Sequence, residues 1–543
     1  MRRLSPLALI LCASCVHPSG RVTPRLPIAA ADLEHRVEII ADDSMEGRLP
    51  GSRGNIQVTD YIASEFKRLG LQPAGDSGGY LQYVPMISSR LDTGEHLTVN
   101  GLPLPFWTGV MPQNPSNAAL QFDPTGVGLV YGGKLGLGTP MISPDSGAGK
   151  IVVFAIGTLP DLRPDLRSGR YLPAFTHRVA AIVIVLPELP PVTIYTHLKR
   201  FSLPSSAHPP VTLQIGAGTA LALFGEQLDR LAVGTPARGM LGGRLRYLEP
   251  ETIQARNVVA ILPGTTRKNE YVAIGAHNDH LGVGAFGLDH DSVRTYNILL
   301  AQRHLDGPAA GNPGSRSPTI TVNVDSLRRI RAPRRDSIFN GADDDGAGTA
   351  SLLAIAQALA TGARPARSVL FVSHTGEEQG LLGSRWYADH TTVPRDSIIT
   401  YLNMDLFGHE YNADSARSGP RYLQSGGARR LSKELGALID SVNATLAEPM
   451  AIDYSWDAPG HPSQKYCRSD HASYARYGIP VAYFSTGYGV DYHQVTDEPQ
   501  YLDYAHMARA AMLVYAVALS VANLDHRPLV DQPKPDPTAP CRQ

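Results

Sequence analysis

Two short acidic segments carry residue types that could hold metal ions and move protons. The first, at 340–348, reads NGADDDGAG and contains three consecutive aspartates between small residues. The second, HTGEEQG, contains the adjacent Glu377 and Glu378. Divalent cations take carboxylate oxygens as ligands, and small neighbouring residues let the backbone come close to the ion. A short Asp-Gly run by itself is more often a solvated turn or a helix N-cap, so the rest of the chain has to decide between these interpretations.

Further groups with ligand chemistry stand where predicted strands end. Apolar, β-branched runs predict these strands at 271–276, 368–373, 398–404 and 480–484. The candidate groups, with one aspartate of the first acidic segment included, are His277, Asp279, His280, Asp344, Glu377, Glu378, Asp405 and His493. Open α/β sheets bind ligands in the crevice beyond the carboxyl ends of their strands. We therefore expect these side chains to meet at one edge of a sheet, although each of them alone would more often be structural.

The elements that must position these groups predict an α/β fold for residues 251–526. A further strand is expected at 257–262, and helices are expected at 349–360, 381–390, 428–446 and 504–523. Strands that alternate with helices favour a mostly parallel, mixed sheet flanked by helices on both faces. Residues 28–118, with a helix at 60–69 that Gly70 ends, are expected to form the first part of the same domain.

Two segments interrupt this pattern. In residues 119–250, short β-branched runs at 150–156, 180–186 and 211–215 predict strands, and few catalytic residue types gather there. This segment is expected to be a small β-rich insert. Residues 281–340 are rich in Gly, Pro and Arg, and they predict a long loop with one β-like piece at 319–324.

The composition restricts the classes of partner. The chain has 543 residues, which favours more than one domain, and 43% of them are hydrophobic. Charged residues make up 18%, and the formal net charge is -1. This is the composition of a soluble globular protein, and it gives no electrostatic argument for nucleic acid or a membrane surface as partner.

Both ends of the chain carry signals of their own. Arg2 and Arg3 precede an apolar run, so residues 1–20 are expected to be a signal peptide or a lipoprotein signal with a lipid anchor at Cys15, too short for a membrane span. Cys467 and Cys541 are the cysteines beyond this segment, and an oxidising compartment would allow them to pair. The Pro-rich tail at 527–543 predicts an extended or disordered end.

Five motifs also resemble those of a known family. AHNDH, GADDDGAG, TGEEQGLLGS, NMD and YHQVTDEP, in this order, are similar to the metal motifs of the M28 zinc peptidases, the aminopeptidase Y or bacterial leucyl aminopeptidase group. The resemblance covers about 255–500, and SMEGRLPGSRG at 44–54 resembles the N-terminal part of the same catalytic domain. Residues 119–250 resemble the protease-associated (PA) domain that many members carry. The resemblance implies a zinc-exopeptidase (phosphorylase/hydrolase-like) fold.

The resemblance also implies a metal site. Two Zn²⁺ ions are expected, with Mn²⁺ or Co²⁺ as substitutes. The expected ligands are His277 and Asp405 for one ion, Glu378 and His493 for the other, and Asp344 as the bridge between them. A cis peptide bond is expected after this bridging residue.

Three further roles follow from the same resemblance. Glu377 is expected to be the general base that takes the proton of the attacking water. Asp279 is expected to hold the His277 imidazole by its other nitrogen. Tyr492 is expected to assist the oxyanion.

The implied function is that of an exported metallo-exopeptidase. The first interpretation is an aminopeptidase that hydrolyses N-terminal residues from peptides with a metal-activated water. Three alternatives are a glutamate-carboxypeptidase-like carboxypeptidase or dipeptidase, a glutaminyl cyclase and a catalytically silent receptor-like protein. All five ligands and Glu377 are present, which disfavours the cyclase and the receptor. The expected location is the periplasm, the outer membrane as a lipoprotein, or the exterior of a bacterium.

Overall fold

The computed structural model describes residues 27–113, 120–135, 140–156, 178–186, 199–204, 210–305, 321–409, 419–459, 461, 464–539 and 541–543. The predicted signal at 1–20, with Cys15, lies outside the described residues.

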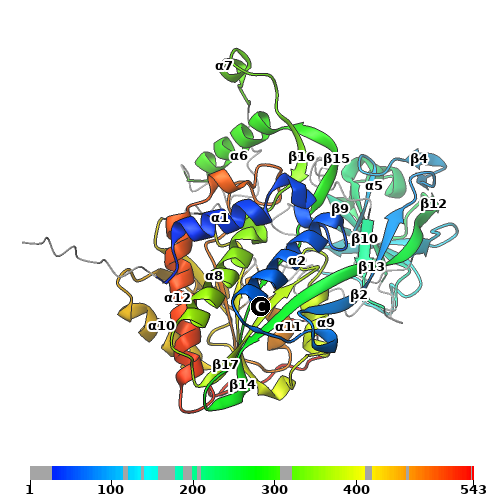
Figure 1. The fold of residues 1–543 in the computed structure, drawn as a ribbon. Helices are drawn as coiled ribbons and strands as arrows, with labels where there is room; N and C mark the ends of the chain where they lie inside the picture. Colours follow the sequence, from blue (N-terminus) through cyan, green and yellow to red (C-terminus); the bar gives the residue numbers. More distant parts are fainter. Residues whose placement is uncertain are drawn as a thin grey trace, which may run out of the picture.

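An eleven-stranded mixed sheet forms the centre of the larger domain (Figure 1). Its strands follow the order β10-β2-β13-β17-β14-β18-β21-β19-β20, and β1 and β6 pair with β13 at its side. The bounds are β1 Gln72–Pro73, β2 Leu81–Leu91, β6 Gln121–Phe122, β10 Lys199–Ser202, β13 Leu245–Leu262, β14 Arg267–His277, β17 Arg367–His374, β18 Ile398–Met404, β19 Tyr422–Gly426, β20 Ala451–Asp453 and β21 Val481–Ser485. Strands β17, β14, β18 and β21 are parallel to one another. The five strands expected between 257 and 484 are thus confirmed, and so is the α/β class.

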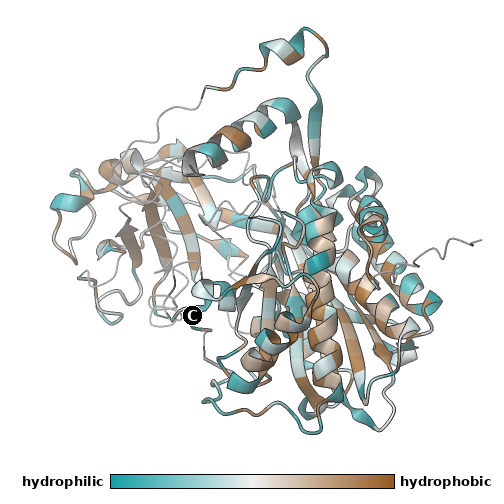
Figure 2. Cartoon of the chain, turned by 90° about the vertical axis from the view of Figure 1, so that its left-hand side faces the viewer, coloured by the Kyte–Doolittle hydropathy of each residue, from teal (hydrophilic) through white to brown (hydrophobic). Residues whose placement is uncertain are grey.

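Helices cover both faces of this sheet. Strand side chains alternate between the faces, so Val258 and Val272 belong to one apolar core while Val259 and Ala273 belong to another. The first core contains residues of α1 (Ala30–Ile40), α2 (Arg53–Arg68), α8 (Gly348–Thr361), α10 (Lys433–Thr445) and α12 (Tyr504–Asn523). The second contains residues of α9 (Leu382–Asp389) and α11 (His471–Ala475). Figure 2 shows hydrophobic residues along the strands between these layers.

Helix ends follow their capping residues. The helix expected at 428–446 begins at Lys433, because the Ser432 hydroxyl accepts a hydrogen bond from the backbone N–H of Leu435 (3.1 Å). The helix expected at 60–69 begins earlier, at Arg53, where Ser52 is the N-cap. Among the described residues, α12 is the one helix long and apolar enough to cross a membrane, by length and composition only. It is also a core helix of the larger domain.

The 119–250 segment contributes to a smaller layer of its own, on the right in Figure 1. Five strands follow the order β5-β11-β9-β8-β7, all parallel except β5. Their bounds are β5 Val110–Gln113, β7 Leu129–Lys134, β8 Ile151–Ala155, β9 Ala181–Leu186 and β11 Val211–Gly216, followed by α5 Ala217–Phe224. A second small sheet contains β3 Leu97–Val99, β4 Leu102–Leu104 and β12 Leu241–Gly243. The three expected strands are confirmed; the boundary at 119 and the likeness to a PA domain stay predictions.

The interpretation of 281–340 as one long loop is wrong for its described part. Strands β15 (Gly282–Asp289) and β16 (Arg335–Phe339) pair antiparallel, α6 (His290–Leu305) follows β15, and α7 (Asp325–Arg328) lies at the outer end (Figure 1). The expected β-like piece at 319–324 is also wrong where it can be compared, since residues 321–324 are in no strand. The glycine-rich sequence of β15, GVGAFGLD, hides the strand pattern.

The C-terminal tail is attached to the domain. Cys467 and Cys541 form a disulfide with an S–S distance of 2.10 Å, the pairing that the sequence had left open. The side chain of Gln543 accepts a hydrogen bond from the backbone N–H of Tyr466 (2.9 Å). The described part of 527–543 contains no helix or strand, and it includes a turn in which the backbone N–H of Ala539 donates to the carbonyl of Asp536 (3.1 Å).

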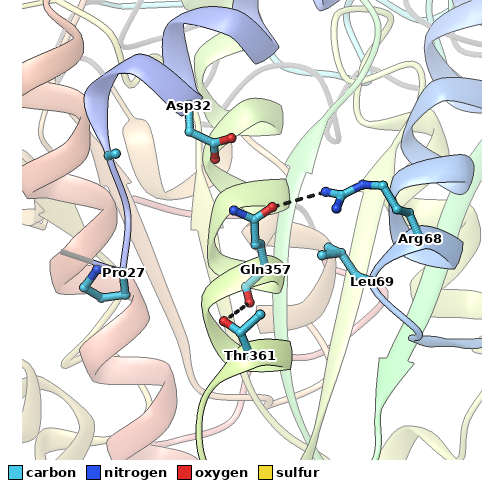
Figure 3. A pocket seen from close by; sticks show the side chains of 7 residues that line it. Pro27, Asp32, Arg68, Leu69, Gln357 and Thr361 are labelled. Atoms are coloured by element: carbon cyan, nitrogen blue, oxygen red, sulfur yellow. Dashed lines mark hydrogen bonds between the residues drawn. The ribbon is translucent and has the colours of Figure 1, made fainter. Parts of the chain in front are cut away.

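A surface pocket lies among α1, α2 and α8 (Figure 3). Arg68 donates a hydrogen bond to Oε1 of Gln357 (3.1 Å) at its wall. Gln357 lies nine residues after the first residue of α8, roughly 14 Å along the helix axis. The pocket is therefore separate from the strand ends, where the candidate ligands gather.

Candidate metal centre

The carboxyl ends of the parallel strands place most of the candidate side chains. His277 is the last residue of β14, and Asp405 directly follows β18. Glu377 and Glu378 lie in the turn after β17, and His493 lies in the loop after β21. The acidic turn at 342–347 leads into α8 and supplies Asp344. Because parallel strands end at the same edge of the sheet, these segments converge.

The first group of potential ligands contains His277, Asp344 and Asp405. Nε2 of His277 lies 3.2 Å from Oδ1 of Asp344 and 3.9 Å from Oδ1 of Asp405. All three residues are buried. One imidazole nitrogen and two carboxylate oxygens at this spacing suit a divalent cation.

The second group lies on the other side of the same aspartate. Nε2 of His493 lies 3.1 Å from Oδ2 of Asp344 and 3.1 Å from Oε2 of Glu378. The two oxygens of Asp344 thus face two different histidines, as a bridging carboxylate requires. The peptide bond between Asp344 and Asp345 is cis, as the resemblance implied.

His280 also contacts the second group, in agreement with its place among the candidate groups at the strand ends. Its Nδ1 lies 2.7 Å from Oε1 of Glu378 and 4.0 Å from Oδ2 of Asp344. His280, Asp344 and Glu378 form a group of potential ligands by themselves. The signal was present in AHNDH, but the resemblance gave no role to the second histidine of that motif.

Two observations indicate that these side chains are suited to bind metal ions. Nε2 of His277 and Nε2 of His493 are buried and make no hydrogen bond of good geometry among the described residues, and orphaned buried polar atoms are rare in native proteins. Burial raises the pKa of Glu377 well above its ordinary value; His277 lowers it, and the charges of Asp405 and Glu378 raise it. Crowded, buried carboxylates with free nitrogen and oxygen donors are the environment that a divalent cation stabilises.

Glu377 lies beside the first group. Its Oε2 lies 4.0 Å from Nε2 of His277, whereas Oδ1 of Asp344 lies 3.2 Å from the same nitrogen atom. Adjacent Glu378 points to His280 and His493 instead. The two neighbouring carboxylates therefore have different surroundings. Glu378 lies among the potential ligands, and Glu377 lies next to them.

Asp279 makes a different contact from the expected one. Nδ1 of His277 lies 3.0 Å from the backbone oxygen of Asp279, while the nearest carboxylate oxygen is 3.7 Å away. That oxygen, Oδ1, accepts a hydrogen bond from the backbone N–H of Glu377 (3.1 Å). Asp279 thus holds the imidazole with its main chain and the Glu377 turn with its side chain.

Tyr492 lies against the second group. Its ring stacks on that of His493 with centroids 3.8 Å apart. The ring of Tyr488 also packs against that of Tyr492, with centroids 4.6 Å apart. The ring contact places Tyr492 directly beside one of the expected ligands.

Further buried groups hold the ligand loops. Asp345 accepts a hydrogen bond from the backbone N–H of His277 (2.9 Å), and Asp497 accepts from the backbone N–H of Asp343 (2.9 Å). Asp470 is buried next to the site, and burial raises its pKa to about 7, an effect that His277 opposes. Arg48, from the 44–54 segment, is a residue to which the sequence reasoning gave no role, although it donates to the carbonyls of both ligand loops.

The comparison with protein families decides the classification of this arrangement. Residues 257–518 match the model described as peptidase family M28. This segment of the chain is similar to the M28 peptidases. The match contains all five expected metal ligands and Glu377.

Curated relatives of the chain include two fungal proteins. Leucine aminopeptidase 1 of Paracoccidioides brasiliensis (strain Pb03) is 29% identical over 254 residues, which cover 42% of this chain and 58% of that protein. Leucine aminopeptidase 1 of Ajellomyces capsulatus is 27% identical over 322 residues, which cover 57% of this chain and 66% of that protein. The chain thus spans less than two thirds of the length of these relatives.

Solved structures share the fold along almost the whole chain. An aminopeptidase from Aneurinibacillus sp. strain AM-1 aligns with a TM-score of 0.55 and 15% identity, over 94% of this chain and 97% of that one. BSAP, a zinc aminopeptidase from Bacillus subtilis, aligns with a TM-score of 0.51 and 16% identity, over 93% and 99%. At this identity the likeness supports the fold alone.

Proposed function

We propose that the chain is a dizinc aminopeptidase that removes N-terminal residues from peptides. One observation carries the proposal: the carboxylate of Asp344 lies between two histidines, with Nε2 of His277 at 3.2 Å and Nε2 of His493 at 3.1 Å. The printed names of the curated relatives, leucine aminopeptidases, support the same reaction class.

The two groups of potential ligands each supply the residues for one proposed metal ion. His277 and Asp405 would hold one Zn²⁺, Glu378 and His493 would hold the other, and Asp344 would bridge them. When bound, the two ions would polarise the scissile carbonyl and lower the pKa of a water molecule. Mn²⁺ or Co²⁺ could substitute by availability.

The side chains of this chain perform the remaining steps. Glu377 accepts the proton of the attacking water on a carboxylate oxygen and then gives it to the nitrogen of the leaving amine. The Tyr492 hydroxyl donates a hydrogen bond to the oxygen that becomes negative. Asp279 keeps the Glu377 turn in place through the bond to its backbone N–H.

The aminopeptidase is favoured over the carboxypeptidase alternative because the curated relatives carry the printed name leucine aminopeptidase.

Export from the cell is part of the proposal. The disulfide between Cys467 and Cys541 is a bond typical of oxidising compartments. Together with the signal expected at 1–20, it supports a periplasmic, outer-membrane or extracellular location.

The reaction is tested with a mixed pool of peptides and mass spectrometry over time. We expect stepwise loss from free amino termini and no loss from N-acetylated copies. Loss from carboxyl termini would move the chain to the carboxypeptidase class. Cyclised N-terminal glutamine would move it to the cyclases, and an unchanged pool in the presence of Zn²⁺ would contradict an enzyme.

A further inference from the structure

Arg48 lies fully buried under the candidate metal centre, with 0% of its surface exposed. Its guanidinium group donates only to backbone carbonyl oxygens among the described residues. Nε donates to Asn278 (3.1 Å), Nη1 to Ile40 (3.1 Å) and Nη2 to Gly341 (2.8 Å) and Asp344 (3.4 Å). Nη1 also bonds the carbonyl of Asn340.

Apart from that of Ile40, the last residue of α1, these carbonyls belong to the two segments that carry ligands or lead into them. Asn278 is the residue between His277 and Asp279, and it follows β14. Gly341 begins the acidic turn that carries Asp344. One side chain thus connects the β14 end to the acidic turn, which are more than sixty residues apart in the sequence.

Few side chains could replace this guanidinium. Several carbonyl oxygens converge on it, so the partner must offer several N–H donors in different directions and no acceptor. Arginine offers five donors in a rigid planar fork, whereas lysine offers three from one nitrogen atom. The N–H groups of the acidic turn have their own partner, because Asp497 accepts from Asp343 (2.9 Å) and Asp344 (3.2 Å). Arg48 and Asp497 therefore hold the carbonyl and N–H sides of the same turn.

The segment before Arg48 is shaped for this close approach. Gly47 has a φ of +60°, and a Cβ atom there would come within 2.5 Å of the carbonyl oxygens of Gly282 and Phe339. Arg48 also has a left-handed backbone, with a φ of +53°. In addition, its own carbonyl accepts a hydrogen bond from the backbone N–H of His280 (3.3 Å). The backbone is thus bent to bring this side chain beneath the ligand loops.

We propose that Arg48 is a positioning residue that holds the His277 loop and the Asp344 turn in the arrangement that binds metal. The inference rests on the metal site of the proposed function and extends it to the 44–54 segment, which contains no proposed ligand. Outer groups that orient metal ligands typically change metal affinity by about 10- to 100-fold when they are replaced.

The test compares Arg48→Lys with Arg367→Lys in the full chain. Arg367 serves as the control, because it is 1% exposed and donates to the carbonyls of Val521 (3.3 Å) and His526 (2.9 Å) near the opposite end of the sheet. Unlike Arg48, it also forms an ion pair with Glu270 (2.7 Å). Two quantities are measured for each protein: the Kd for Zn²⁺ by competition with a chromophoric chelator, and the melting temperature with and without Zn²⁺.

We expect Arg48→Lys to raise the Zn²⁺ Kd by about tenfold or more and to shrink the increase in melting temperature that Zn²⁺ causes. Arg367→Lys should lower both melting temperatures equally and leave the Kd unchanged. The inference is overturned if Arg48→Lys binds Zn²⁺ as the wild type does, or if it fails to fold at all, since a positioning role requires a folded metal-free chain. A wild-type chain that binds no Zn²⁺ would instead overturn the proposed metal site itself.

Discussion

The backbone N–H of Glu377 donates a hydrogen bond to Oδ1 of Asp279 across the active-site edge of the sheet, at 3.1 Å. This bond joins the turn after β17 to the loop after β14. It gives the Asp279 carboxylate a role in placing the proposed base, while the Asp279 main chain contacts the imidazole of His277 (3.0 Å).

Asp279→Ala is therefore expected to lower kcat by roughly tenfold or more while Zn²⁺ content stays near that of the wild type. The reason is that the main-chain contact to His277 survives and the bond to the Glu377 turn does not. Asp279→Asn is the matched control, because an amide oxygen still accepts the N–H bond, and it should keep most of the activity. Metal analysis and steady-state kinetics check both variants. Loss of Zn²⁺ in both would show that the carboxylate orients His277 instead.

Glu377→Gln should keep the metal and lose turnover. The amide has the same shape but cannot accept a proton, so kcat should fall by roughly 10²- to 10⁴-fold, the usual contribution of a general base. KM and Zn²⁺ content should change little. Near-normal turnover in this variant would exclude Glu377 as the base.

Asp344→Asn and Asp405→Asn should differ in their metal content. The two oxygens of Asp344 face His277 and His493 (3.2 and 3.1 Å), so its replacement should weaken both metal positions. Asp405 belongs to only one of the groups of potential ligands, so its replacement should leave the other ion in place. Elemental analysis after dialysis measures the ratio. Two ions retained by Asp344→Asn would contradict a bridging role.

A separate prediction concerns stability against acid. Glu65 accepts hydrogen bonds from Arg68 and Arg36, each at 2.8 Å, and these partners hold its pKa at about 2, below the ordinary value of 4.5. A lowered pKa means that the folded state binds the proton less readily than the unfolded state does. The contribution of Glu65 to stability is therefore present above pH 4.5 and is lost as the pH falls toward 2.

Glu65→Gln should accordingly lower the free energy of unfolding at pH 7 by about 1 kcal/mol, the scale of partly exposed ion pairs. The difference from the wild type should shrink as the pH falls below 4.5. Urea unfolding at several pH values measures it. A difference that stays constant down to pH 3 would show that the charge of Glu65 contributes nothing.

Sequence patterns predicted the parts of the fold that depend on local apolar runs. The run at 271–276 is a strand because its side chains pack alternately into the two cores, as those of Val272 and Ala273 do. The residues at the ends of such strands could then be expected to meet, and His277, Asp344 and Glu378 do so. Neither step requires knowledge of distant contacts.

Distant contacts explain what the sequence did not predict. Arg48 acts through carbonyl groups, which every residue has, so no pattern of residue types marks its partners. The contact of Asp279 with His277 is likewise made by the main chain. Strand β15 is glycine-rich, and its pairing with β16 is set by tertiary position rather than by local hydrophobic alternation.

The most direct test of the account is a titration of the metal-free chain with Zn²⁺ while the cleavage of a leucyl peptide and of its N-acetylated twin is followed. The account predicts no cleavage without metal and an increase that ends near two Zn²⁺ per chain, with the free amino terminus as the only point of attack. Cleavage by a chain whose metal content is zero, or equal cleavage of the acetylated twin, would contradict it.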